Sequence, residues 1–182
     1  MSTKPALPLD DMHSRHDGLT EAIANCYAEA ARVCLDRHHT PPEEIQIKSD
    51  DDETDHAVIA NWVPTDDQTK GAWANTDDAT RDGAYAFALA AAELAKGLVA
   101  VHRAETRTGA DYYIAPKGRT IEDLEECVRL EVSGVDRGSE GAVAQRLKAK
   151  LKQAAAGASN LPAMAGVVGF EAALILLASL EE

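Results

Sequence analysis

Two acidic residues lie on neighbouring predicted strands in the stretch from Gly97 to Gly134. Asp111 is the second residue of the segment ADYYIAP, and Glu131 lies near the end of CVRLEVSG. If these strands are antiparallel neighbours, their carboxylates meet across the hairpin. Mg²⁺ and Mn²⁺ prefer carboxylate oxygens, and a cation bound in this way can polarise a phosphate or activate water. The pair therefore indicates a metal-dependent hydrolytic site, although the same hairpin could be purely structural.

The elements that would position this pair follow from the hydrophobic pattern. The segment ATRDGAYAFALAAAELAK predicts a largely buried helix that ends at Gly97, a residue suited to a left-handed C-terminal cap. Three strands are predicted next, LVAVHRAE, ADYYIAP and CVRLEVSG, followed by the helix EGAVAQRLKAKLKQAAAG and the strand AMAGVVGF. This order, αβββαβ, indicates a mixed α/β (α+β) fold. The apolar end EAALILLASLEE fits either a helix or a strand.

The residues before this core predict an elaboration. Residues 19–37 carry apolar side chains at three- and four-residue steps, which is typical of an amphipathic helix. The segments EIQIK and HAVIANWV then predict a β-hairpin. Residues 1–17 show no apolar period, and we expect a mobile tail there. The expected organisation is one domain over 18–182, with the elaboration at 18–75 and the αβββαβ core at 76–182.

The charge is unevenly distributed. The formal net charge is −13, and residues 1–80 contain 6 Lys and Arg against 17 Asp and Glu. An acidic surface repels polyanions, so this argues against broad nucleic-acid affinity but not against a local basic face. No run of 18 apolar residues is present, and the start MSTKPALPLDDMHSRHDG lacks the apolar centre of a signal peptide. We therefore expect a cytoplasmic protein without a membrane partner.

The run AKGLVAVHRAETRTGADYYIAP…VRLEVSG resembles the core of the restriction-endonuclease-like, or PD-(D/E)xK, superfamily, and is most similar to its Holliday-junction-resolvase style. The residues KGL at 96–98 match the cap between the first helix and strand. GAD at 109–111 matches the turn before the motif Asp, and EVS at 131–133 occupies the (D/E)xK position. The resemblance covers roughly half of the chain and extends to a group of uncharacterised bacterial proteins. It implies DNA as the substrate and Mg²⁺ or Mn²⁺ as the cofactor, held by Asp111 and Glu131.

Ser133 departs from the family's pattern, in which a lysine helps to activate the attacking water and to stabilise the pentacovalent phosphate. A hydroxyl group carries no charge, so it cannot supply that electrostatic stabilisation. Some family members use a basic residue of the following helix instead. Lys148 is the residue we assign to this role, with Lys150 and Arg146 as alternatives. The run RLKAKLK is also typical of a solvated helix face.

The family pattern also includes an acidic residue on the first helix. We expect it at Asp82, in the early turns, as a third metal ligand. Glu93, near the end of the helix, is the alternative. Both also fit structural functions, because an acid is favourable near a helix N-terminus and Glu93 could pair with Lys96.

Two classes of function follow. The first is a divalent-metal-dependent nuclease acting on DNA, or a degenerate descendant of one. The second is a non-catalytic protein-interaction module, or a homodimeric accessory protein, of a bacterial defence or genome-maintenance system. Ser133 and the acidic first third favour the second class. The run VVGFEAALILLASL, which is more apolar than one short strand needs, indicates a homodimer surface.

Overall fold

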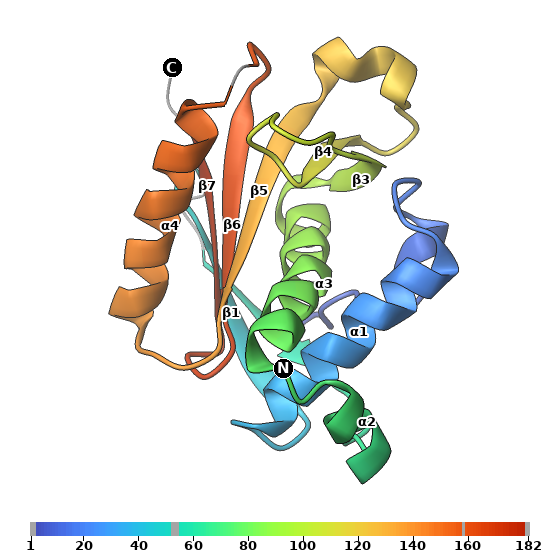
Figure 1. Ribbon diagram of the computed structural model, residues 1–182, viewed down its shortest axis with the longest axis vertical. Coiled ribbons are helices and arrows are strands. Elements are labelled where there is room, and N and C mark those ends of the chain that lie inside the picture. The colour runs from blue at the N-terminus through green and yellow to red at the C-terminus, as the bar shows by residue number, and fades with distance from the viewer. Residues whose placement is uncertain (1–2, 52–54, 158, 181–182) are drawn as a thin grey trace.

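A mixed sheet forms the centre of the computed structural model, which describes residues 3–51, 55–157 and 159–180 (Figure 1). Within these residues the sheet has seven strands in the order β2-β1-β7-β6-β5-β4-β3. The pairs β1–β7 and β5–β6 are parallel, and the other pairs are antiparallel. The strand bounds are β1 Glu43–Ser49, β2 His56–Ala60, β3 Leu98–Arg103, β4 Tyr112–Pro116, β5 Val128–Val135, β6 Ala163–Gly169 and β7 Leu174–Ser179.

Helices cover both faces of the sheet. One face carries α3 (Thr76–Lys96), against which α1 (Glu21–Asp36) packs, and the other face carries α4 (Glu140–Ala155) (Figure 1). Shorter helices are α2 (Asp67–Ala72) and the 3₁₀ helices η1 (Met12–Ser14) and η2 (Ile121–Glu126). The predicted mixed α+β fold is confirmed. No helix in the described part of the chain is both long enough and apolar enough to span a membrane.

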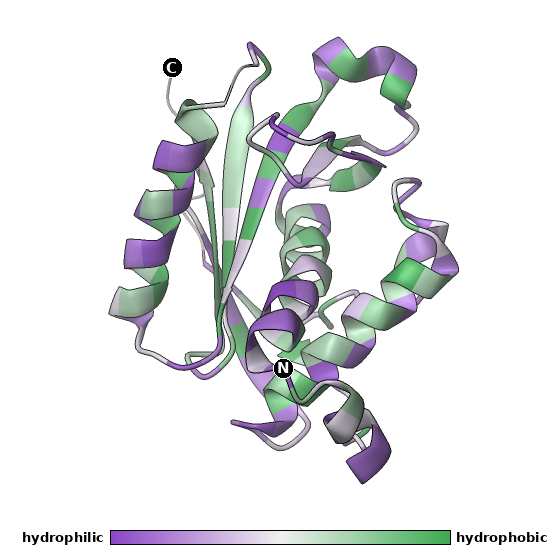
Figure 2. Cartoon of the chain, in the orientation of Figure 1, coloured by the Kyte–Doolittle hydropathy of each residue, from purple (hydrophilic) through white to green (hydrophobic). Residues whose placement is uncertain are grey.

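The alanine-rich sequence of α3 lets it approach its neighbours closely. Figure 2 shows its first turns as hydrophilic, and the following turns are buried. A Cβ added at Gly83 would lie 2.9 Å from the Cα atom of Ala31 on α1, so only glycine fits at this crossing. The helix ends at Gly97, whose φ of 64° is left-handed, as the sequence predicts. The next residue begins β3, the strand that leads towards the candidate site.

The apolar end of the chain forms β7. This strand lies between β1 and β6, and four of its six residues are buried. Together with β6 it buries the apolar run from which we inferred a homodimer surface. The surplus of apolar residues is therefore explained within one copy of the chain, and the homodimer stays a prediction without that support.

Residues 3–17 pack against the domain, whereas the sequence predicts a mobile tail. Leu7 and Met12 are buried, and Ala6 forms a β-bridge with Ile59 on β2. Gly18, just beyond this segment, donates its N–H to the carbonyl of Ala100 on β3. The N-terminal segment thus contacts both edge strands of the sheet. The sequence pattern missed this because the buried apolar side chains of this short segment do not recur at a regular spacing.

The neutral imidazole of His16 links this segment to β3 and α3. Its side chain is fully buried, Nδ1 accepts the N–H of Ala100 at 2.9 Å, and Nε2 lies 2.9 Å from Glu93 Oε2. Because Nδ1 accepts a hydrogen bond, Nε2 carries the proton and donates it to Glu93. Burial lowers the pKa of His16 below its usual value of 6.5, against the opposing effect of Glu93.

This lowered pKa predicts acid destabilisation. The neutral imidazole stabilises the folded state fully above pH 6.5, and we expect that contribution to be lost as the pH falls from there through the lower folded-state pKa. Protonation removes the acceptor of the Ala100 N–H, at a cost of about 1 to 3 kcal/mol. Urea unfolding of the wild type and of His16→Gln between about pH 8 and about pH 5 measures this contribution. The variant should lose part of the pH dependence.

His102→Gln is the matched control, because His102 is exposed on β3. Its unfolding free energy should follow the wild-type pH dependence. Equal pH dependence in the wild type and His16→Gln would show that His16 does not titrate between the folded and unfolded states.

Candidate functional site

Asp111 lies immediately before β4, directly against β5. The two strands are antiparallel, with Tyr112 opposite Leu130, as the sequence argument required. The backbone N–H of Asp111 donates to the carbonyl of Leu130 at 2.8 Å, and its carboxylate Oδ2 accepts the N–H of Val132 at 2.8 Å. These two bonds flank Glu131 on β5. The hairpin therefore brings both predicted acidic residues to one place on the sheet.

A tyrosine and an arginine hold the other oxygen of Asp111. The hydroxyl of Tyr85, on α3, donates to Oδ1 at 2.8 Å, and Arg103 Nη2 lies 3.5 Å from the same atom. The Arg103 guanidinium also lies over the rings of Tyr85 and Tyr112, 4.7 Å from each centroid. Burial and the nearby carboxylate raise the pKa of Tyr85 to about 12, so its hydroxyl stays protonated and donates. The orientation of Asp111 is thus fixed from α3, β3 and β5.

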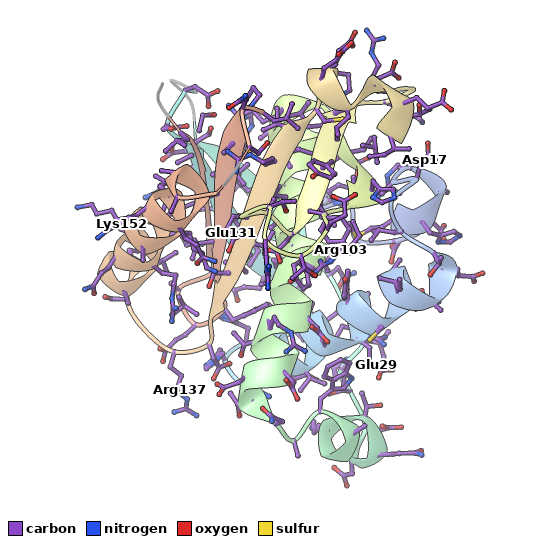
Figure 3. All side chains as sticks on the ribbon, turned by 45° about the horizontal axis from the view of Figure 1, so that its top comes forward. Asp17, Glu29, Arg103, Glu131, Arg137 and Lys152 are labelled. Carbon is purple, nitrogen blue, oxygen red and sulfur yellow. The ribbon has the colours of Figure 1, made fainter. Side chains whose placement is uncertain are left out.

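Glu131 is buried on β5 and paired with Lys150 of α4. Lys150 Nζ lies 2.7 Å from Glu131 Oε1 and 3.2 Å from Gln153 Oε1. Only 5% of Glu131 is exposed, so its charge needs this nearby cation. Figure 3 shows Glu131 between α4 and the loop that follows Arg103, while Lys152 points away from the sheet. One of the alternatives from the sequence, Lys150, is therefore the helix lysine that contacts Glu131 of the acidic pair.

The two carboxylates lie between two adjoining hollows. A cleft of about 400 Å³ is formed by the first half of α3, by β5 and by the face of α4 nearest to β5. A second hollow of about 380 Å³ lies under the loop before β4, and Asp111 and Glu131 line both. The larger cleft is lined by Asp77, Thr80, Arg81, Tyr85, Asp111, Glu131, Val132, Ser133, Gly134, Arg146, Lys150 and Gln153.

The remaining sequence candidates divide between this cleft and other places. Ser133 and Arg146 line the cleft, whereas Lys148 is exposed and outside it. Asp82 also lies outside it and accepts from Arg81 Nε at 2.8 Å. Glu93 is bound to Arg15 and His16. No group of three or more His, Cys, Asp or Glu residues is arranged to hold a metal ion within the described ranges.

Arg129 is a residue of the site region that the sequence argument missed. It is 3% exposed, and its guanidinium donates to the carbonyls of Leu161, Thr108 and Ala154. These carbonyls belong to the loop before Asp111, the end of α4 and the approach to β6. An arginine two residues before Glu131 on one strand face was the available signal. Arg129 therefore ties together the three segments that border the acidic pair.

Replacing Arg129 by methionine is expected to lower the free energy of unfolding by about 3 kcal/mol. The variant leaves three carbonyls without their donor and removes a buried charge beside Glu131. Urea unfolding measures the loss. Arg119→Met is the control, because Arg119 is half exposed and pairs with the exposed Glu126, and its loss should stay below about 1 kcal/mol. Equal losses of unfolding free energy in the two variants would show that Arg129 does not hold these three segments together.

Comparison of the chain with protein-family models, with curated proteins and with solved structures found no match.

Proposed function

We propose that the Asp111–Glu131 cleft is a PD-(D/E)xK-type site for metal-dependent hydrolysis of DNA phosphodiesters, in which Lys150 replaces the motif lysine. The observation that carries the proposal is the convergence of Asp111, Glu131 and Lys150 from the residue before β4, from β5 and from α4. The chain order α3-β3-β4-β5-α4-β6 supports it, because it is the αβββαβ order of that superfamily's core. Ser133 and Lys150 line the same cleft. In this proposal Lys150 therefore supplies, from α4, the positive charge that is missing at the motif position.

The donor set fits a hard divalent cation. Mg²⁺ is commonly bound by one or two carboxylates, with water and substrate phosphate oxygens completing its coordination. Asp111 and Glu131 supply two carboxylates that line the same two hollows. When bound there, Mg²⁺ or Mn²⁺ would neutralise phosphate charge and lower the pKa of water.

The protein's own groups have separate functions in this proposal. Tyr85 and the Val132 N–H orient the Asp111 carboxylate, so little reorganisation is needed when a substrate binds. Lys150 places a positive charge beside Glu131, where negative charge would develop on the phosphate. Arg81 and Arg146 line the cleft and can pair with flanking phosphates. With Lys150 they supply three positive charges to a cleft that Asp77, Asp111 and Glu131 also line.

The experiment that tests the proposal is metal-dependent cleavage by the wild-type protein. End-labelled single-stranded, duplex and four-way-junction DNA would be incubated with Mg²⁺, with Mn²⁺ or with EDTA. We expect at least one substrate to be cut with either cation and none with EDTA. Calorimetric titration with Mn²⁺ alone provides a second readout, and the absence of both cleavage and binding heat would reject the proposal.

One observation favours a second candidate, a non-catalytic member of the same fold. Both carboxylates already have cationic partners within the chain, Glu131 with Lys150 and Asp111 with Arg103. Such pairing can stabilise a fold without any chemistry. This candidate predicts no cleavage of any of the three DNAs, together with lower stability when either pair is broken.

A further inference from the structure

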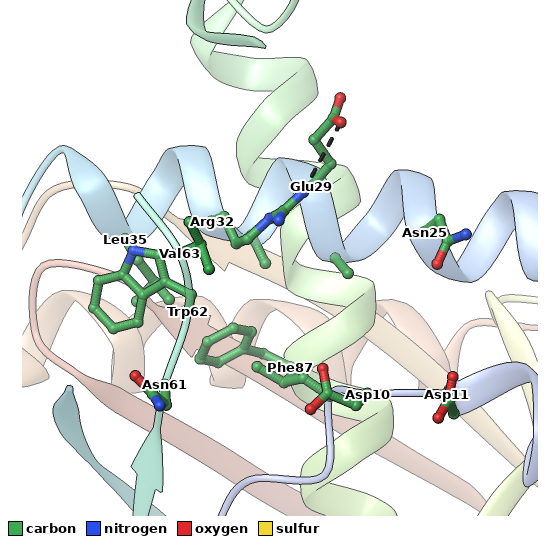
Figure 4. Close-up of a pocket in the computed structure, with 13 residues that line it drawn as sticks. Asp10, Asp11, Asn25, Glu29, Arg32, Leu35, Asn61, Trp62, Val63 and Phe87 are labelled. Atoms are coloured by element: carbon green, nitrogen blue, oxygen red, sulfur yellow. Dashed lines mark ion pairs between the residues drawn. The ribbon is translucent and has the colours of Figure 1, made fainter. Parts of the chain in front are cut away.

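A third and larger hollow lies between α1, the N-terminal segment and the end of β2 (Figure 4). Its volume is about 690 Å³, and it shares no lining residue with the Asp111–Glu131 cleft. We call it the α1 cleft. It is lined by Leu9, Asp10, Asp11, Asn25, Ala28, Glu29, Ala31, Arg32, Leu35, Asn61, Trp62, Val63 and Phe87.

The α1 cleft has an apolar floor and a polar rim. Phe87, Leu35 and Trp62 form much of the floor and are almost fully buried. Val63 at the edge is 74% exposed, which is unusual for a large aliphatic side chain beside a hollow. This combination of an apolar floor with a few polar groups is typical of a site that receives a side chain from another molecule.

The charges of the rim define the partner's chemistry. Three carboxylates line the α1 cleft, those of Asp10, Asp11 and Glu29, against the single guanidinium of Arg32. In Figure 4 only Glu29 and Arg32 are joined by an ion pair, at 3.9 Å. Arg15, which does not line the cleft, donates to the backbone carbonyls of Asp10 and Asp11 and offsets part of their charge. Residues 1–80 as a whole contain more acidic than basic side chains, which adds to the negative electrostatic potential around the α1 cleft.

A buried donor in the α1 cleft also lacks an acceptor. Arg32 Nε is inaccessible to solvent and has no hydrogen-bond partner among the described residues. A buried unpaired donor costs free energy, and such groups in folded proteins usually require an explanation. Because the atom is inaccessible, a carbonyl of a docked backbone would satisfy this N–H only after the Arg32 side chain, which is 39% exposed, changed its conformation.

We infer that the α1 cleft docks a basic segment of a partner protein, with an apolar side chain on the floor and Lys or Arg side chains at Asp10 and Asp11. Charge complementarity selects this occupant over nucleic acid, which the same carboxylates would repel. The inference does not depend on the proposed nuclease activity, because the two sites are separate.

Fluorescence anisotropy with a labelled synthetic peptide of about 15 residues, built from Leu and Lys, tests the inference. The cleft variant combines Asp10→Asn and Asp11→Asn. Asn tolerates the left-handed backbone of Asp11, whose φ is 50°, so the fold should be kept. We expect binding to weaken at least about tenfold in this variant and in Ala28→Leu, which fills the hollow.

The matched control combines Glu122→Gln and Glu125→Gln, which changes the net charge equally on exposed residues of η2. It should bind the peptide as the wild type does, and a peptide with Glu in place of Lys should not bind. Equal weakening in the cleft and control variants would overturn the inference, as would unchanged binding by Ala28→Leu. Sedimentation of the wild type that shows self-association abolished by the cleft variant would instead assign the occupant to a second copy, which also overturns it.

Discussion

Replacing Asp111 by asparagine is expected to lower the rate of metal-dependent DNA cleavage by about a thousandfold or more. Asparagine keeps an oxygen that can accept the Val132 N–H but loses the negative charge that would bind the cation. It also ends the charge attraction to Arg103, so a small loss of stability accompanies the change. Cleavage rates at saturating Mg²⁺, measured well below the melting temperature of the variant, check this prediction.

Asp82→Asn is the matched control, because the sequence argument assigned this residue to the same metal whereas the structure places it outside the cleft. Its carboxylate pairs with Arg81. We expect the control to cleave DNA within about twofold of the wild-type rate, since Arg81, which lines the cleft, keeps its other ion pair, with Asp78. If both variants lost activity equally, the metal set would include α3. If Asp111→Asn kept full activity, the acidic pair would not be the site.

The second large effect is expected at Lys150. A Lys150→Gln variant should cleave DNA about a hundredfold more slowly, because it removes the positive charge beside Glu131 that would stabilise the phosphate in the transition state. The buried Glu131 also loses its cation, so the free energy of unfolding should fall. Single-turnover cleavage and urea unfolding of the same preparation separate the two effects.

Two further variants test whether the loss of cleavage rate is due to the Lys150 side chain itself. Lys148→Gln removes the same charge from an exposed position of α4 outside the cleft and should stay within about twofold of wild type. Lys150→Arg keeps the charge and should recover part of the rate. A larger loss in Lys148→Gln than in Lys150→Gln would restore the original assignment to Lys148 and contradict the structural one.

The sequence predicted the secondary structure well where the pattern was local. The amphipathic period of α1, the glycine cap at Gly97 and the alternation in β5 each depend on neighbours within a few residues. The apolar end of the chain could not be assigned to a helix or a strand, because a continuous apolar run has no period. Its pairing with β1 and β6 makes it a strand. The packing of residues 3–17 was missed for a similar reason.

For the candidate site, the sequence predicted the acidic pair but not its surroundings. Asp111 and Glu131 could be paired from strand order alone. The choice between Lys148 and Lys150 depends on the rotation of α4 about its axis, which is set by its packing on β5, β6 and β7. Tyr85, Arg103 and Arg129 come from separate elements and meet only in the folded chain. No local pattern of carboxylates and lysines in the sequence marks these three residues.

The position of β7 sets the order in which the protein can fold during synthesis. β1 and β2 form an antiparallel hairpin, and β1 also pairs with β7. On the ribosome that hairpin waits for more than a hundred residues before its partner strand is made. Contacts of such long sequence separation slow folding and leave strand edges exposed meanwhile. The sheet therefore closes only after its last strand has been synthesised, and binding of the hairpin by a chaperone during translation would shorten the time that its edge is exposed.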